Sequence, residues 1–142
     1  MYKNSVLIVE DQYIMAHVMV QKLTQLGFIM AHAHTGESAI EKLKDKAFYF
    51  ILMDIELGKG INGIVTTQKI RILEQKTGRP HTPIIALAND LTDEKKAYYL
   101  EKSFDDAINK PLTDDRCHHV ISVARKMWSS NNLPHINHNN SL

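Results

Sequence analysis

Acidic residues stand directly after short apolar runs, and this pattern restricts the fold of the chain more than any other feature. Residues 6–9 form one such run and precede Glu10 and Asp11. Residues 50–53 form a second run and precede Asp54. Runs of four apolar residues are typical of buried strands. Strands are therefore expected to place these three carboxylates.

Two further apolar runs predict strands whose ends lead to the same region. Residues 84–87 form one of them, and a shorter run at Ala107 and Ile108 lies just before Lys110-Pro111. Parallel strands end at one edge of a sheet, and open α/β sheets bind ligands beyond that edge. Three carboxylates and one ammonium gathered there predict a site for a divalent cation and a phosphoryl group.

Between the strands, apolar residues recur at helical spacing. In the first helix the inner face is expected to carry Met15, Met19, Leu23 and Leu26. The last helix is expected to begin at an N-cap, Thr113. Helices are expected over about residues 12–26, 38–44, 62–77, 93–103 and 114–128. A further strand is expected over residues 28–31. Five strands that alternate with five helices predict an α/β fold with a doubly wound parallel sheet.

Composition indicates one small domain. The chain has 142 residues, 44% of them hydrophobic, which is enough for one core and too few for two ordinary domains. We expect a folded domain over residues 1–128 and a polar, disordered tail over residues 129–142, with no output domain in between or beyond. The formal net charge of +1 indicates no general attraction to DNA or to an anionic membrane.

Cysteine content and hydropathy predict a cytoplasmic location. The single Cys117 cannot form an internal disulfide. No apolar stretch approaches the roughly 20 residues that cross a bilayer, so no membrane insertion is expected.

The chain resembles the receiver domain of two-component response regulators and hybrid sensor histidine kinases over residues 4–128. The resemblance rests on an ordered set of motifs, which are Val9-Glu10-Asp11, Met53-Asp54-Ile55, Gly63, Pro83-Ile84-Ile85-Ala86-Leu87 and Asn109-Lys110-Pro111. It implies the flavodoxin-like (βα)5 receiver fold and a role in phosphorelay signal transduction. It also implies that the domain promotes its own phosphotransfer without being a classical enzyme.

The resemblance assigns a role to each site residue. Asp54 would accept a phosphoryl group from a histidine kinase or a histidine phosphotransfer domain. Glu10, Asp11, Asp54 and the backbone carbonyl of Glu56 would hold Mg²⁺, which prefers oxygen ligands. Lys110 and the metal would reduce the repulsion between an attacking carboxylate and an anionic phosphoryl group. The family pattern also suggests a cis bond between Lys110 and Pro111.

Two positions depart from the family pattern. Ala88 stands where receivers usually carry a Thr or Ser that bonds a phosphoryl oxygen, and Ala107 stands where they usually carry a Tyr or Phe that turns inward on activation. Both switch positions are therefore altered. We hypothesise that Asn89, the next residue along, donates instead. The loop over residues 56–63 has glycines where many receivers have a Pro.

Three classes of function stay open on these grounds. The preferred class is a phosphoacceptor, either a single-domain regulator or the receiver part of a hybrid kinase, and a homodimer is compatible with it. The second is a phosphorylation-independent interaction module with a receiver fold. The third is a small enzyme such as a flavodoxin or an aspartate-dependent phosphatase. This third class is disfavoured because no phosphate-binding loop follows the first strand and no second Asp stands two residues after Asp54.

Overall fold

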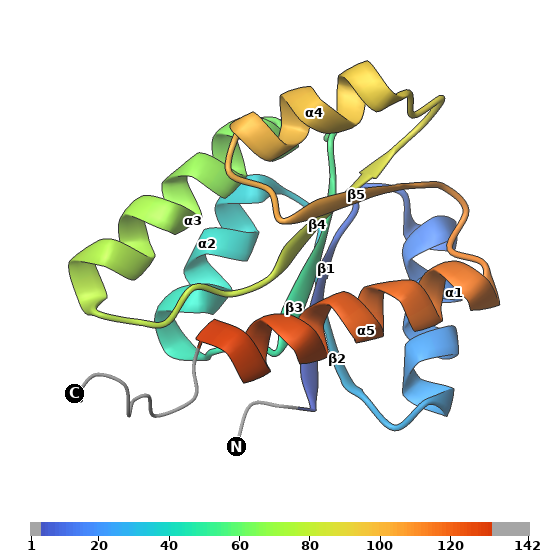
Figure 1. Cartoon of the computed structure of the whole chain (residues 1–142), viewed down its shortest axis with the longest axis horizontal. Coiled ribbons are helices and arrows are strands. Elements are labelled where there is room, and N and C mark those ends of the chain that lie inside the picture. The colour runs from blue at the N-terminus through green and yellow to red at the C-terminus, as the bar shows by residue number, and fades with distance from the viewer. Residues whose placement is uncertain (1–3, 132–142) are drawn as a thin grey trace.

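The computed structural model describes residues 4–131, and within them the chain forms one five-stranded parallel sheet with five helices (Figure 1). The strand order is β2-β1-β3-β4-β5. The strands are β1 (Ser5–Val9), β2 (Ile29–Ala33), β3 (Phe50–Asp54), β4 (Ile84–Ala88) and β5 (Asp106–Asn109). The helices are α1 (Tyr13–Gln25), α2 (Gly36–Asp45), α3 (Gly63–Thr77), α4 (Asp93–Glu101) and α5 (Asp114–Asn131). The predicted flavodoxin-like (βα)5 sheet is confirmed.

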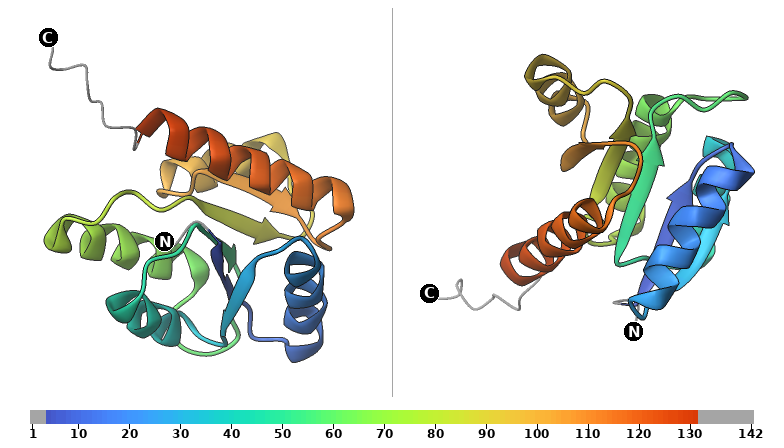
Figure 2. Two further views of the ribbon diagram at one scale, coloured as in Figure 1. Left: turned by 90° about the horizontal axis from the view of Figure 1, so that it is seen from below. Right: turned by 90° about the vertical axis from the view of Figure 1, so that its right-hand side faces the viewer.

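Helices cover both faces of the sheet, as Figure 2 shows from two sides. Side chains of α1 and α5 pack on one face, and side chains of α2 and α3 pack on the other, where the partly buried Tyr99 of α4 joins them. Successive strand residues point to opposite faces, so Leu7 and Val9 enter one cluster while Val6 and Ile8 enter the other. A strand buried on both faces must be apolar at every position, which explains the continuous runs in the sequence.

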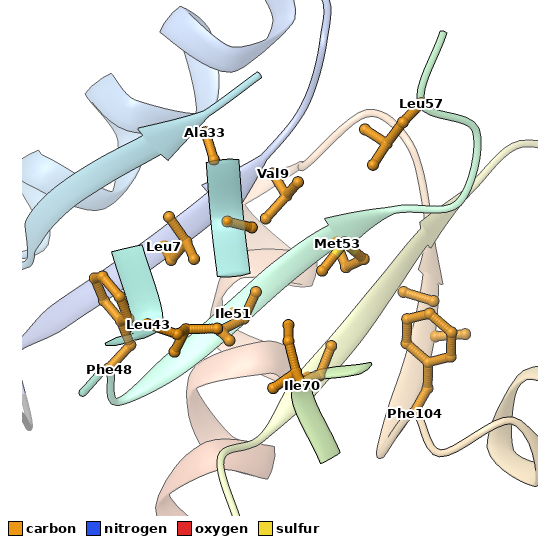
Figure 3. Close-up of a cluster of buried hydrophobic side chains, with 14 residues drawn as sticks. Leu7, Val9, Ala33, Leu43, Phe48, Ile51, Met53, Leu57, Ile70 and Phe104 are labelled. Carbon is orange, nitrogen blue, oxygen red and sulfur yellow. The ribbon is translucent and has the colours of Figure 1, made fainter. Parts of the chain in front are cut away.

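The larger cluster lies between the sheet and the helices α2, α3 and α4. Figure 3 shows Ile51 and Met53 of β3 at its centre, with Leu43 and Ile70 reaching them from α2 and α3. Phe104, in the turn before β5, is also buried there. This packing holds β3, and therefore its last residue, in a fixed position.

Side-chain caps define where several helices begin. Thr35 and Asn62 accept hydrogen bonds from backbone N–H groups in the first turns of α2 and α3, at 3.0 and 2.9 Å. Thr92 does the same for α4 at 3.1 Å. The predicted cap at Thr113 is confirmed by its 3.2 Å bond from the N–H of Arg116.

Two details differ from the expectations. Leu26 is 47% exposed and does not join the core, because α1 ends at Gln25 and Leu26 lies in the turn that leads to β2. The last helix continues to Asn131, so residues 129–131 of the expected tail are helical. The rest of that tail lies outside the described residues. None of the helices within residues 4–131 is both long and apolar enough to span a bilayer.

The strand order places a crevice beside β1. The chain passes from β1 to β2 on one side and continues at β3 on the other, so the loops after β1 and β3 leave in different directions. Such a reversal of strand order creates the ligand-binding crevice of open α/β sheets.

Candidate functional site

The ends of β1 and β3 bring three carboxylates together. Val9 pairs with Met53 in the parallel ladder, so the next residues, Glu10 and Asp54, lie side by side. Oxygen atoms of Glu10, Asp11 and Asp54 all lie within 4.8 Å of one another. Glu10 and Asp54 are buried, whereas Asp11 is half-buried. The predicted acidic cluster is therefore formed.

Lys110 follows β5 and reaches the same cluster. Its Nζ lies 2.9 Å from Asp54 Oδ1 and 3.5 Å from Glu10 Oε1. Its backbone N–H donates to the carbonyl oxygen of Ala88 at 2.9 Å, which ties the end of β5 to β4. The bond from Lys110 to Pro111 is cis, as the sequence suggested. Strand pairing thus places the ammonium beside the acidic cluster.

Burial and neighbouring charges both shift the pKa values in this cluster. Burial, together with the neighbouring charge of Asp54, raises the pKa of Glu10 from 4.5 to about 7. For Lys110, burial opposes the charged form, but the hydrogen bond and charge of Asp54, helped by Glu10, outweigh it and raise the pKa. The pocket therefore holds the lysine charged and resists full ionisation of its acids.

A divalent cation fits these residues. Among residues 4–131, Glu10 Oε1 is a buried oxygen with no hydrogen-bond partner, although Lys110 lies near it. One oxygen of Asp11 accepts a 2.8 Å bond from the N–H of Gly58. Carboxylate oxygens that converge on one point are ligands suited to a hard cation such as Mg²⁺ or Ca²⁺. Glu10, Asp11 and Asp54 can supply them.

The loop after β3 folds back over Asp54. The N–H of Glu56 donates to Asp54 Oδ1 at 3.2 Å, which places the Glu56 backbone beside the cluster, while the side chain of Glu56 is exposed. The N–H of Gly63 donates to the carbonyl oxygen of Ile55 at 3.0 Å. A Cβ atom at Gly63 would collide with the carbonyl oxygen of Asp54, so this close return of the chain requires glycine.

Comparison with known proteins identifies the family. A family model described as "Response regulator receiver domain" matches residues 6–122. The chain belongs to this family of receiver domains. Receiver-containing relatives include hybrid signal transduction histidine kinase M of Dictyostelium discoideum, 33% identical over 109 residues, and the autoinducer 2 sensor kinase/phosphatase LuxQ of Vibrio vulnificus, 33% identical over 113 residues. These matches cover 75% and 80% of this chain but only 4% and 13% of the relatives.

Solved structures support the same fold. The receiver domain of Ssk1 from Saccharomyces cerevisiae, crystallised with the histidine phosphotransfer protein Ypd1, superposes with a TM-score of 0.80 at 24% identity. The match covers 87% of this chain and 90% of that one.

The two positions that the resemblance marks as altered switch positions both lie in the sheet. Ala107 is buried in β5, in the core cluster under α4. Ala88 ends β4 and, with Asp54 and Asn89, lines a pocket of about 60 Å³ beside the acidic cluster. Neither alanine can supply a hydroxyl group or a ring. The hypothetical donor Asn89 is exposed at the pocket rim.

Two residues of α4 also line this pocket, and the sequence reasoning missed both. They are Lys95 and Tyr99. A signal for them exists in the sequence, since Thr92 caps α4 and residues four apart lie on one helix face. That signal becomes specific only when the position of α4 relative to β3 and β4 is known.

Proposed function

We propose that this receiver domain is a phosphoacceptor, in which Asp54 takes a phosphoryl group from a phosphohistidine of a histidine kinase or a histidine phosphotransfer domain. The observation that carries the proposal is the position of Asp54. It is buried, 2.9 Å from the ammonium of Lys110 and within the cluster that Glu10 and Asp11 complete. A nucleophilic carboxylate, a cation binder and a positive counter-charge are the parts that phosphoryl transfer to an aspartate needs.

In the proposed transfer, an oxygen of Asp54 attacks the phosphorus atom of the donor. The P–N bond breaks, its electron pair returns to the imidazole, and a P–O bond to Asp54 forms. The N–H of Glu56 and the ammonium of Lys110 orient the carboxylate through Oδ1. Lys110 also offsets the charge on the incoming phosphoryl oxygens.

We assign the cation as Mg²⁺, held by Glu10, Asp11, Asp54 and the backbone carbonyl of Glu56. When bound, it would offset negative charge at the phosphoryl oxygens. Two features support this assignment. Glu10 Oε1 is buried without a hydrogen bond, and burial together with the charge of Asp54 raises the pKa of Glu10.

The phosphoryl donor is proposed to dock over α1. Tyr13, Ile14 and Val18 on this helix are 69%, 83% and 46% exposed, although they are apolar or aromatic. Exposed apolar side chains that gather on one surface mark interaction sites, and Tyr13 follows the acidic residues Glu10 and Asp11 by only a few positions. The Ssk1 receiver was crystallised with a histidine phosphotransfer protein, and hybrid kinases are among the relatives. A single-domain regulator and the receiver of a hybrid kinase both agree with this picture, and we place the reaction in the cytoplasm.

The second candidate is an interaction module that works without phosphorylation. The buried alanines at positions 88 and 107 favour it, because neither can perform the hydroxyl or aromatic part of the usual switch. The complete set of acids and lysine favours the phosphoacceptor. A chemical test separates the two.

The test is the intact mass of the protein after incubation with acetyl phosphate, with and without Mg²⁺. We expect a phosphoryl adduct that requires Mg²⁺, is removed by hydroxylamine and is absent in Asp54→Asn. Asp90→Asn is the matched control, because Asp90 is an exposed acid at the same edge of the sheet. No adduct on a folded wild-type protein would favour the interaction module.

A further inference from the structure

The pocket beside Asp54 lies between the ends of β3 and β4 and the helix α4, which all contribute lining residues. Its volume of about 60 Å³ has room for several water molecules, at about 10–15 Å³ each. Asp54 and Ala88 line it from the sheet, and Lys95 and Tyr99 line it from α4. A group attached to Asp54 on this side would therefore face α4.

A phosphoryl group in this pocket needs a positive partner. It would bring nearly two negative charges close to the side chain of Glu56, which also lines the pocket. The methyl group of Ala88 cannot donate a hydrogen bond. Among the described residues that line the pocket, Lys95 is the one with a positive charge. Lys110 approaches Asp54 without lining this pocket.

Lys95 is held near the pocket by a weak partner. Its Nζ donates to the backbone carbonyl oxygen of Asp90 at 3.1 Å, and its side chain is exposed. A phosphoryl oxygen carries negative charge that a neutral carbonyl oxygen lacks, so it attracts the ammonium more strongly. Exchange of the Asp90 carbonyl for a phosphoryl oxygen would therefore be favourable.

The helix that carries Lys95 is loosely packed. None of its residues, Asp93–Glu101, is fully buried, and the structure describes all of them. Tyr99 attaches it to the core through ring contact with Phe104, at 6.0 Å between centroids, and Lys96 pairs with Asp106 at 3.1 Å. A helix with so little buried surface can shift at low cost.

We infer that Lys95 is a second phosphoryl-binding ammonium. It binds a phosphoryl oxygen in place of the hydroxyl group that Ala88 lacks. In doing so it draws the first turn of α4 toward phosphorylated Asp54. Tyr99 forms the wall against which this turn moves. The inference rests on the proposed phosphoacceptor function and gives it an output element, α4, that needs neither a hydroxyl at position 88 nor a ring at position 107.

The test uses beryllofluoride, which mimics a phosphoryl group on an aspartate, in the presence of Mg²⁺. Its affinity is measured by ¹⁹F NMR, and the response of α4 is measured by amide hydrogen exchange at saturation. We expect Lys95→Met to bind about tenfold more weakly, the scale of one hydrogen bond to a charged group. We also expect the variant to lose the protection that beryllofluoride induces in α4, whereas Lys95→Arg retains it.

Lys96→Met is the matched control, since it removes the same charge from the neighbouring residue, whose Nζ faces Asp106. It should bind beryllofluoride like the wild type. Loss of the Lys96–Asp106 pair loosens α4 in the free protein, but the helix should still gain protection when beryllofluoride binds. Equal affinity and equal α4 protection in Lys95→Met would overturn the inference, and so would a loss found only in Asn89→Ala. Wild-type protein that does not bind beryllofluoride would instead overturn the phosphoacceptor function itself, and the inference with it.

Discussion

The two edges of the sheet carry charged clusters of opposite character. At the carboxyl edge, Glu10, Asp11 and Asp54 share one ammonium, and Glu10 Oε1 has no hydrogen bond within the described chain. At the other edge, where β4 and β5 begin, Arg71 of α3 lies between two carboxylates. Its NH1 bonds Glu74 Oε1 at 3.0 Å, and its NH2 bonds Asp105 Oδ2 at 2.7 Å.

The cluster around Arg71 satisfies nearly all of its polar atoms. Arg71 also donates to the carbonyl oxygens of Thr82 and Ser103, at 2.8 and 3.1 Å. Glu74 accepts from the N–H of Thr82 at 2.8 Å, and Asp105 accepts from the N–H of Ile84 at the same distance. A buried charge is tolerated when it is paired and hydrogen-bonded in this way.

The difference separates a structural cluster from a functional one. The Arg71 cluster joins α3 to the two strands and leaves no strong site for a ligand. The acidic cluster keeps unfavourable repulsion that only a cation or a proton can relieve. Unsatisfied electrostatics of this kind are common where a protein binds or reacts. Stability measurements can test this contrast.

The largest effect should come from breaking the structural cluster. Arg71→Leu removes the cation beside buried Glu74 and half-buried Asp105, and only Asp105 keeps another partner, His81. We therefore expect it to lower the free energy of unfolding by about 3 kcal/mol. Urea denaturation at pH 7 measures this change. Lys69→Leu, on an exposed position of the same helix, is the control and should cost little. A loss below about 1 kcal/mol for Arg71→Leu would remove the contrast between the two clusters.

Neutralising Glu10, in the acidic cluster, should raise the free energy of unfolding rather than lower it. The pKa of Glu10 rises from 4.5 to about 7 on folding, so between these pH values the folded state holds a proton that the unfolded state releases. The stability that this group contributes is complete below pH 4.5 and is lost as the pH rises to about 7.

We therefore expect Glu10→Gln, in the absence of divalent cations at pH 8, to raise the free energy of unfolding by about 2 kcal/mol. The variant should also lack the decline in stability between pH 4.5 and about 7 that Glu10 produces in the wild type. Glu101→Gln, at an exposed acid of α4, is the control. Urea denaturation between pH 4.5 and pH 8 measures both the gain in stability at pH 8 and the decline at lower pH. A destabilised Glu10→Gln would contradict the proposed excess of negative charge.

Magnesium should give the smallest effect and act only on the functional cluster. At pH 8, Mg²⁺ at ten times its Kd should stabilise the wild type by about 1.4 kcal/mol, because binding relieves the repulsion around Glu10 and Asp54. Glu10→Gln should respond less, and Arg71→Lys should respond like the wild type. KCl at equal ionic strength controls for screening. An equal response of wild type and Glu10→Gln would argue against binding at these acids.

Much of the candidate site could be predicted before the fold was known. Glu10 and Lys110 each follow a strand and Asp54 ends one, and in a parallel sheet the ends of strands meet at one edge. The cap at Thr113 was also predictable, because a cap depends on contacts within a few residues. Leu26 was misplaced because helical spacing does not show where a helix gives way to a turn.

The sequence by itself therefore determined the features that depend on local patterns: the strands, the helices between them, and the acids and lysine that the strands place together. Only the tertiary structure decided how distant segments meet. It brought Lys95 and Tyr99 of α4 to the pocket beside Asp54, and it gathered Arg71 with residues from two other segments of the chain. Such contacts depend on how helices pack across the sheet, and packing geometry has no short-range signal in the sequence.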